Sequence, residues 1–321
     1  MNILITGATG FVGTHLIDLY IKDRKSKNLH CVTFGESRTL QQVIPKEQCY
    51  EIDLTQPEKV YELVEKVKPQ EVIHLAAMAA VGESFLDPQK VLQNNILTSV
   101  NILEAVRRHA RKATVLLIGS ADEYGLVKPE EPISEDIPLR PTSPYAVSKV
   151  AVDYLGLQYV LAHKLRIVRL RPFNHIGEYQ GVGFAVADFA KQIVEAELDK
   201  RNVIKVGNLS AVRDFTDVKD MVEAYRLALA KCVPGEVYNV GSGKGVRMQD
   251  LLNLMLKQAT REIRVEVDPR KYRPVDVESV VADPTKFMRQ TGWRPKVPLE
   301  NTLTRVLNYW RKLLIMHKEM R

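Results

Sequence analysis

The fold of this chain is decided by the stretch Asn2-Ile3-Leu4-Ile5-Thr6-Gly7-Ala8-Thr9-Gly10-Phe11-Val12-Gly13. Its apolar first part predicts a strand, which glycines at a GxxGxxG spacing connect to a helix. The first glycine permits the tight turn, the second lets the backbone approach a pyrophosphate, and the third lets the helix pack closely on the sheet. A glycine turn without a ligand is the alternative, but a helix N-terminus in this position favours an anion. We therefore expect a dinucleotide to bind at Gly7, Thr9, Gly10, Phe11, Val12 and Gly13.

Apolar, β-branched runs alternate with segments of helical periodicity through the first half of the chain. This alternation is typical of a parallel sheet whose strands are joined by crossover helices. We therefore predict an α/β fold with a doubly wound parallel Rossmann sheet. The expected strands are Asn2 to Thr6, Leu29 to Phe34, Val72 to Leu75, Thr114 to Gly119 and Arg166 to Arg171, and the expected helices are Phe11 to Tyr20, Glu58 to Val67, Val91 to His109 and Tyr145 to His163.

The pattern becomes less regular after Arg171-Pro172. We expect residues 1–173 to form the dinucleotide-binding domain, with later segments around 211–243 returning to it. Residues 174–321 should form most of a smaller, discontinuous mixed α/β lobe, with the active site between the two parts. In this half the expected helices are Phe184 to Asp199, Lys219 to Lys231, Met248 to Lys257 and Leu299 to Leu314, and the expected strands are Ile204 to Val206 and Glu236 to Val240.

Composition narrows the class of protein. A chain of 321 residues with 45% hydrophobic residues can bury a large core. The net charge of +7 suits nucleic acid or a small polyanion, but the basic residues are dispersed among acidic ones and no nucleic-acid-binding motif accompanies them. No run is long enough for a membrane span, and Met1 leads directly into the first strand, so we expect a cytoplasmic protein that binds neither nucleic acid nor membrane. The three cysteines are too scattered for a disulfide framework or a metal site.

The end of the second expected strand bears on the choice of cofactor. An acid at this point grips the ribose hydroxyls of NAD, whereas an arginine accommodates the 2′-phosphate of NADP. The sequence Gly35-Glu36-Ser37-Arg38 contains both residue types. Arg38 and its small neighbours leave room for a phosphate, so we favour NADP(H), with NAD as the open alternative.

A possible catalytic set lies in Tyr145-Ala146-Val147-Ser148-Lys149, at the start of an expected helix. Tyr145 and Lys149 are four residues apart and share one face, where an ammonium favours the phenolate and brings the pKa of tyrosine toward neutral. Gly119-Ser120 ends an intervening parallel strand, at the edge where active sites of such sheets lie. We predict that Tyr145 transfers a proton, that Ser120 hydrogen-bonds the reacting oxygen, and that Lys149 holds the nicotinamide ribose. The alternative for Ser120 is an ordinary strand-end turn.

The glycine loop and the Ser120, Tyr145 and Lys149 set resemble the extended short-chain dehydrogenase/reductase superfamily, and the resemblance covers essentially the whole chain. It includes His74-Leu75-Ala76-Ala77, which ends the fourth strand, and Asn95 in the next helix. The resemblance implies that Leu75, Ala76, Ala77 and Asn95 help to bind the cofactor. It also implies that Asp53 and Leu54 contact adenine, although an aspartate before Thr-Gln-Pro is equally an ordinary helix cap. We assign no catalytic role to His74 or His175.

Two later stretches, Arg171-Pro172-Phe173-Asn174-His175-Ile176-Gly177 and the run from Val206 to Val218, closely resemble the GDP-4-keto-6-deoxy-mannose reductases. That resemblance implies NADPH-dependent reduction of the C4 ketone of GDP-4-keto-6-deoxy-D-mannose, to GDP-D-rhamnose or to its C4 epimer GDP-6-deoxy-D-talose. It implies a homodimer through a four-helix bundle built from Val91 to His109 and the helix of Tyr145. A sugar diphosphate needs cations and neutral donors, and the implied substrate-binding residues are Ser84, Ser120, Asn174, Lys191, Lys205, Arg213, Arg273 and Asp276.

Three other functions remain open from the sequence. A GDP-mannose 4,6-dehydratase needs an extra carboxylate for elimination, and its family carries Thr-Asp-Glu or Thr-Ser-Glu where this chain has Ser120-Ala121-Asp122. Asp122 is therefore a candidate catalytic acid, shorter than the expected glutamate. A nucleotide-sugar 4-epimerase would use the same oxidation chemistry with a retained NAD. The non-enzyme alternative is an NADP-binding sensor, which the complete set of Ser120, Tyr145 and Lys149 disfavours.

Overall fold

The computed structural model describes residues 1–23, 28–35, 37–128, 131–199, 202–272 and 274–319. Its centre is a seven-stranded sheet in the order β10-β6-β5-β4-β1-β2-β3, with every neighbouring pair parallel. The order reverses on either side of β1, so the predicted doubly wound Rossmann sheet is confirmed. The strands are β1 (Asn2–Thr6), β2 (Asn28–Thr33), β3 (Cys49–Glu51), β4 (Glu71–His74), β5 (Thr114–Ile118), β6 (Arg166–Pro172) and β10 (Val237–Val240).

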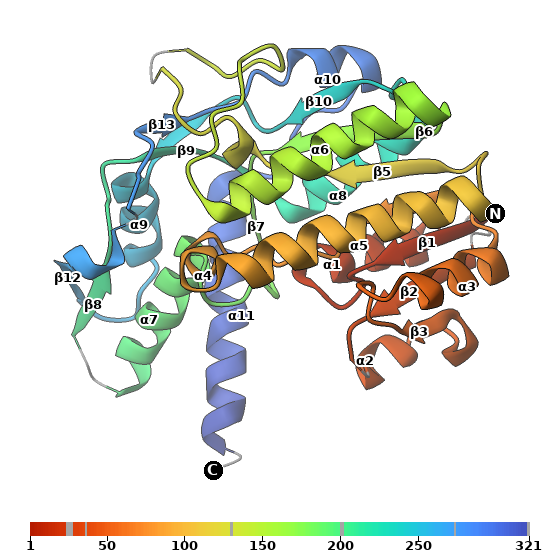
Figure 1. Ribbon diagram of the computed structural model, residues 1–321. Coiled ribbons are helices and arrows are strands. Elements are labelled where there is room, and N and C mark those ends of the chain that lie inside the picture. The colour runs from red at the N-terminus through yellow and green to blue at the C-terminus, as the bar shows by residue number, and fades with distance from the viewer. Residues whose placement is uncertain (24–27, 36, 129–130, 200–201, 273, 320–321) are drawn as a thin grey trace.

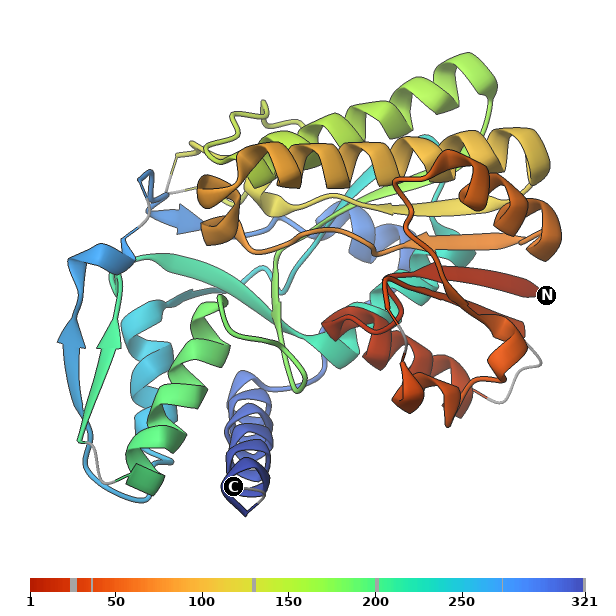
Figure 2. The same ribbon diagram turned by 60° about the horizontal axis from the view of Figure 1, so that its bottom comes forward.

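Helices cover both faces of this sheet (Figures 1 and 2). One face packs on α1 (Phe11–Lys22) and α8 (Val218–Lys231), and the other packs on α3 (Pro57–Val67), α5 (Pro88–His109) and α6 (Pro144–His163). Successive strand residues point to opposite faces, so Ile3 and Ile5 enter the first core and Leu4 enters the second. Because both faces are buried, the inner parts of β1, β4 and β5 are continuously apolar rather than alternating.

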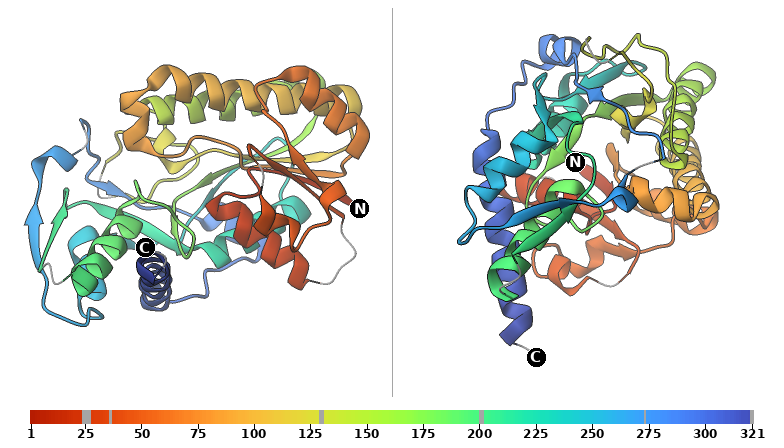
Figure 3. Two further views of the ribbon diagram at one scale, coloured as in Figure 1. Left: turned by 90° about the horizontal axis from the view of Figure 1, so that it is seen from below. Right: turned by 90° about the vertical axis from the view of Figure 1, so that its left-hand side faces the viewer.

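Most of the second half of the chain forms a smaller lobe with its own core (Figure 3). Its four-stranded sheet has the order β11-β9-β13, with β7 also paired to β9, and β12 pairs with β8. Helices α7, α9 and α11 supply the core that packs on these strands. The elements are β7 (Asn174–Ile176), α7 (Ala185–Asp199), β8 (Val203–Val206), β9 (Val212–Asp217), β11 (Gly245–Arg247), α9 (Met248–Leu256), β12 (Arg264–Val267), β13 (Ser279–Val280) and α11 (Leu299–Glu319).

Short elements complete the fold. They are α2 (Arg38–Gln41), η1 (Lys46–Gln48), α4 (Val81–Leu86), η2 (Ala121–Glu123), η3 (Pro269–Lys271) and α10 (Thr285–Thr291). The chain crosses between the two sheets several times, because β9 lies in the small sheet whereas α8 and β10 lie with the large one. The strands β7, β9, β11, β12 and β13 were not predicted, since they are short and carry polar residues, and their partners are distant in sequence.

Candidate functional site

The phosphate loop connects β1 to α1 at the carboxyl edge of the large sheet. Gly7 has a φ of +67°, and a side chain on it would lie 2.9 Å from the amide nitrogen of Ala76. A Cβ on Gly13 would lie 2.4 Å from the carbonyl oxygen of Gly7, so the loop and the first turn of the helix require glycine at both positions. No side chain caps α1 at Gly10, and its first turn carries no acidic residue. This arrangement fits a pyrophosphate at the helix N-terminus, and Thr9, Gly10, Phe11 and Val12 line the same turn.

The neighbouring strand ends show how the other predicted cofactor residues are placed. The carboxylate of Asp53 accepts hydrogen bonds from the amide and hydroxyl of Thr55, which lower its pKa, so it closes a local turn before α3, whose N-cap is Gln56. The hydroxyl of Thr6 accepts a hydrogen bond from the amide of Ala76 at 3.2 Å. Arg38 begins α2, but its side chain lies outside the described residues, as does all of Glu36. Leu54 is buried, and Leu75 and Ala77 are partly buried after β4.

Asn95 organises the loop that follows β4. Its side chain is 1% exposed, accepts a hydrogen bond from the amide of Met78 and donates to the carbonyl of Met78 and the hydroxyl of Ser148. Asn95 therefore ties this loop to α6 rather than presenting its amide to an open site. Ser84 is fully buried on α4, where its hydroxyl donates to the carbonyl of Val81 at 2.7 Å. Neither side chain points freely toward a bound molecule in this arrangement.

Ser120 lies directly after β5, where it caps the short helix η2. Its hydroxyl accepts a hydrogen bond from the amide of Asp122 at 3.1 Å and donates to the Asp122 carboxylate at 3.4 Å. Glu123 completes a capping box, because its Oε1 accepts the amide hydrogen of Ser120 at 2.7 Å. Asp122, the candidate catalytic acid, thus lies beside the Ser120 hydroxyl.

Tyr145 and Lys149 lie in the first turns of α6, which Ser143 caps through the amide of Ala146. Both side chains are 7% exposed. The Lys149 ammonium donates to the carbonyl of Ile118 at 2.8 Å and lies 5.9 Å from the centre of the Tyr145 ring. Ser120, Tyr145 and Lys149 are therefore brought together at the carboxyl ends of the strands, as predicted from their spacing.

The electrostatics of this pair differ from the expectation. Burial raises the pKa of Tyr145 above its ordinary value, and the charge of Asp122 adds to that effect, whereas the contact with Ser120 lowers it. The predicted decrease of the Tyr145 pKa toward neutral is wrong for the protein alone, because burial of the phenol is the largest effect and outweighs the lowering by Ser120. The Lys149 ammonium, which donates to the Ile118 carbonyl, does not offset it. Burial lowers the pKa of Lys149 to about 8, with the charge of Glu123 opposing the change.

On the small lobe, Arg213 of β9 forms an ion pair with Asp276, with 3.0 Å between Nη2 and Oδ1. Asn208 donates to the other oxygen of Asp276 at 2.6 Å. Asn174 of β7 is exposed and lies opposite Phe215, two residues after Arg213, so both predicted residues belong to the same small sheet. Arg273 lies outside the described residues.

The two predicted lysines are less closely associated with this group. Lys191 on α7 pairs with Glu195 at 3.4 Å, one turn along the same helix. Lys205 on β8 is exposed, and its carbonyl accepts a hydrogen bond from the Lys271 ammonium. Both side chains lie at the surface of the small lobe.

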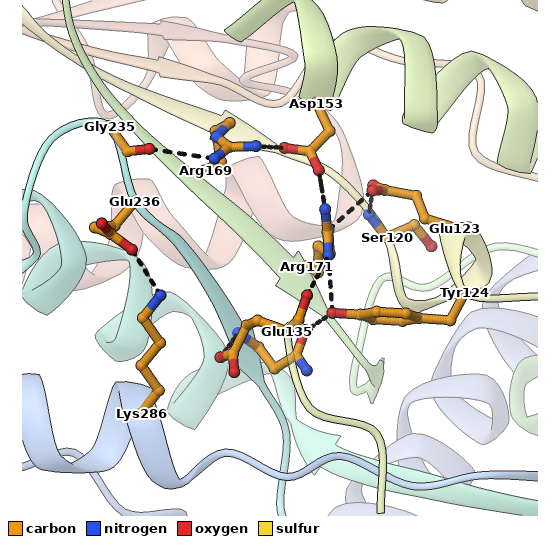
Figure 4. A network of polar contacts seen from close by, with 11 residues as sticks. Ser120, Glu123, Tyr124, Glu135, Asp153, Arg169, Arg171, Gly235, Glu236 and Lys286 are labelled. Atoms are coloured by element: carbon orange, nitrogen blue, oxygen red, sulfur yellow. Dashed lines mark hydrogen bonds and ion pairs between the residues drawn. The ribbon is translucent and has the colours of Figure 1, made fainter. Parts of the chain in front are cut away.

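Sequence reasoning missed a buried ionic network behind Ser120 (Figure 4). Arg171 of β6 lies between the carboxylates of Glu123 and Asp153, and Asp153 also bonds Arg169. Arg171 further donates to the hydroxyl of Tyr124. A signal was present, because arginines within an otherwise apolar central strand must be buried and therefore need acidic partners.

Among the residues placed by the structure, no group of three or more His, Cys, Asp or Glu side chains is arranged to hold a metal ion. No helix in the described ranges is both long and apolar enough to span a bilayer. His74 bonds the hydroxyls of Thr6 and Ser99, and His175 stacks on Phe11, so both histidines have structural partners.

Comparison with known proteins agrees with this geometry. GDP-6-deoxy-D-mannose reductase of Pseudomonas aeruginosa is 34% identical over 311 residues, which cover 96% of this chain and 97% of that protein. A solved structure described as RMD from Pseudomonas aeruginosa complexed with NADPH has a TM-score of 0.84 at 32% identity and covers 97% of this chain and 99% of its own. UDP-glucose 4-epimerase of Thermus thermophilus in complex with NAD has a TM-score of 0.85 at 29% identity, with coverages of 97% and 99%.

The match to a family extends over most of the chain. Residues 4–306 match the family described as GDP-mannose 4,6 dehydratase. This match confirms the resemblance to the extended short-chain dehydrogenase/reductases. That resemblance rested on the glycine loop, on the set of Ser120, Tyr145 and Lys149, and on the later motifs. The chain belongs to the GDP-mannose 4,6-dehydratase family and has the extended short-chain dehydrogenase/reductase fold.

Proposed function

We propose that this protein reduces the C4 ketone of GDP-4-keto-6-deoxy-D-mannose with NADPH, giving GDP-D-rhamnose or its C4 epimer GDP-6-deoxy-D-talose. The observation that carries the proposal is the convergence of Ser120, Tyr145 and Lys149 at the sheet edge that also holds the phosphate loop. Similarity to a GDP-6-deoxy-D-mannose reductase over 96% of the chain supports the choice of substrate.

The chemistry follows from these side chains. Bound NADPH supplies a hydride for the carbonyl carbon. Tyr145 donates its phenolic proton to the carbonyl oxygen, so that the ketone gains a hydride and a proton and becomes a secondary alcohol. Because burial raises the pKa of Tyr145, it is a neutral proton donor at neutral pH, the form that reduction needs. Ser120 hydrogen-bonds the same oxygen, and the positive charge of Lys149 stabilises the phenolate left on Tyr145.

We assign the cofactor to residues 1–173 and the later segments that return to the large sheet. The glycine loop would hold the pyrophosphate, and Arg38 would hold the 2′-phosphate that distinguishes NADP from NAD. Asn95 would act through the loop it orders rather than by direct contact. The other residues proposed to line the cofactor are Asp53, Leu54, Leu75, Ala76 and Ala77.

We assign the GDP moiety to the small lobe, formed mainly by residues 174–321. Arg213 would bind the diphosphate, which requires its guanidinium to be shared with or released from Asp276. Asp276 would then accept hydrogen bonds from the nucleotide ribose. Asn174 would contact the nucleotide-sugar from the same sheet, with Arg273, Lys191 and Lys205 completing the proposed set. Ser84 would act through the α4 turn that its buried hydroxyl closes rather than by direct contact.

We further propose a homodimer in the cytoplasm. Val147, Tyr154 and Leu161 recur every seven residues along α6 and are 44%, 54% and 62% exposed, which forms an apolar stripe on one helix face. Helix α5, with Leu97 exposed, packs alongside α6 and would complete a four-helix bundle with a second copy. The described cysteines are free thiols, which suits a reducing compartment.

Dehydration of GDP-mannose is the second candidate, because the Asp122 carboxylate lies within 3.4 Å of the Ser120 hydroxyl. Purified protein should be incubated with GDP-mannose and, separately, with its 4-keto-6-deoxy product plus NADPH. We expect NADPH to be consumed with the keto-sugar and no ketone to form from GDP-mannose. Ketone formed without net cofactor use would establish the dehydratase, and turnover of neither compound would reject both functions.

A further inference from the structure

Glu123 is a buried carboxylic acid that the proposed chemistry does not use. It is fully buried beneath the Ser120 turn, although glutamate is rarely buried without a structural or functional reason. Its Oε1 accepts the amide hydrogen of Ser120 at 2.7 Å. Its Oε2 lies 3.1 Å from Nε of Arg171, but the Nε hydrogen is directed to Asp153 at 3.0 Å. The Ser120 amide therefore donates the hydrogen bond that holds the Glu123 carboxylate in place.

The packing around Gly119 is matched to this carboxylate. A Cβ on Gly119 would lie 2.2 Å from Oε1 of Glu123, much closer than any real contact. Glycine before Ser120 therefore leaves the space in which the carboxylate reaches the Ser120 amide. The backbone hydrogen bond from Gly119 to Leu170 at 2.7 Å holds the other side of the same turn.

We propose that Glu123 is a positioning residue that fixes the Ser120 turn through the Ser120 backbone amide, so that the Ser120 hydroxyl is held beside Tyr145. The charge of Arg171 attracts the carboxylate toward β6, and Asp153 bonds Arg171 to α6, the helix that carries Tyr145 and Lys149. The network in Figure 4 therefore ties the strand end, the Ser120 turn and the catalytic helix together. The reaction it serves is the proposed reduction, on which this inference rests.

The first test is a double-mutant cycle between Glu123→Ala and Gly119→Ala, measured as kcat for the keto-sugar. Each single change should lower kcat by roughly 10- to 100-fold, because a displacement of about 1 Å in a positioned group costs about that much. The affinity for NADPH should change less than about threefold. The double variant should be slower than Glu123→Ala by at most about threefold, since removal of the carboxylate relieves the 2.2 Å contact and leaves only the 3.0 Å approach of the added methyl group to the Leu170 carbonyl oxygen.

Two further variants, Glu123→Gln and Glu135→Ala, test whether the effect depends on an acceptor for the Ser120 amide. Glutamine keeps an oxygen acceptor for the Ser120 amide and should retain at least about a third of wild-type kcat. Glu135 is the matched control, because its carboxylate also accepts a backbone amide in the same network, that of Asn239 at 2.7 Å, but on the far side of Arg171. Glu135→Ala should lower thermal stability while keeping kcat within about threefold of wild type.

Amide hydrogen exchange over residues 119–123 gives a readout that needs no substrate. The Ser120 amide should exchange at least about tenfold faster in Glu123→Ala and Gly119→Ala than in wild type or Glu135→Ala. Multiplicative losses of kcat in the double variant, a Glu123→Gln as slow as Glu123→Ala, or unchanged Ser120 exchange would each overturn the inference. If the wild type fails to reduce the keto-sugar, the proposed function fails, and the exchange measurement still decides whether Glu123 fixes the turn.

Discussion

The Lys149 ammonium lies 5.9 Å from the centre of the Tyr145 ring and donates to the carbonyl of Ile118 instead. The two groups therefore titrate in separate ranges, with burial raising the pKa of Tyr145 and lowering that of Lys149 to about 8. In the direction of reduction both groups must be protonated. Lys149 loses its proton first as the pH rises, so it should set the basic limit of activity.

We accordingly expect kcat/KM for NADPH to fall above about pH 8, because this parameter reports the ionisation of the free enzyme. The measurement is a pH profile of keto-sugar reduction from about pH 6 to 10. Lys149→Arg keeps its charge throughout that range, so its lower activity should show no decline near pH 8. If the activity of Lys149→Arg declined at the same pH, the loss of activity above pH 8 would belong to another group.

The phosphate loop gives a prediction about cofactor binding alone. A Cβ on Gly13 would meet the carbonyl oxygens of Gly7 and Ala8 at 2.4 and 2.7 Å, so Gly13→Ala must deform the loop. Overpacking of this kind costs about 1–3 kcal/mol, and the Kd for NADPH should rise roughly 10- to 100-fold. Gly181→Ala is the control, since nothing lies within 4 Å of its added methyl group. Equal affinities of the two variants in a fluorescence titration would place the pyrophosphate elsewhere.

Arg213 should affect the nucleotide-sugar and not the cofactor. Hydrogen bonds to a charged group contribute about 1.5–3 kcal/mol, so Arg213→Ala should raise KM for the keto-sugar by roughly 10- to 100-fold. Arg270→Ala is a suitable control, because Arg270 is an exposed arginine of the same lobe that pairs with Asp268. Steady-state kinetics with each substrate varied in turn would detect the difference, and a selective loss of NADPH affinity in Arg213→Ala would argue against the assignment.

The apolar stripe of α6 predicts the oligomeric state. Leu161 is 62% exposed, so Leu161→Glu adds a charge without disturbing the core of the single chain. Light scattering after size-exclusion chromatography should give a dimer for the wild type and a monomer for Leu161→Glu. Ile315→Glu on α11, where an exposed apolar side chain lies away from α6, should remain dimeric. A monomeric wild type would reject the proposed four-helix dimer interface.

Much of the large sheet could be predicted from sequence, because most of its strands have continuous apolar runs and its crossover helices have strong periodicity. The parallel arrangement of these strands also places Gly7, Ser120 and Tyr145 at one edge of the sheet, because parallel strands have their carboxyl ends on the same side. The small sheet was harder to foresee. Arg213 and Asp276 are distant in sequence and meet because β9 pairs with β13, a contact that no local pattern encodes.

The ionisation of Tyr145 shows a second limit of sequence reasoning. Helical spacing correctly placed Lys149 one turn away, but it could not show that the ammonium is committed to Ile118 or that Asp122 faces the phenol. Glu123 escaped notice for a related reason. An acidic residue in a polar turn looks exposed in sequence, and only the packing against Gly119 and Arg171 reveals its burial.

In the proposed reaction, hydride from NADPH and a proton from Tyr145 reach opposite ends of one C4 carbonyl. The most direct measurement is NMR of the product formed from the keto-sugar with NADPH that carries deuterium at the transferred position. We predict one deuterium at C4 of a GDP-6-deoxy-hexose, in stoichiometric amount with the NADPH consumed, and a rate at least about 100-fold lower for Tyr145→Phe. Deuterium absent from C4, or a Tyr145→Phe variant as fast as the wild type, would contradict the account.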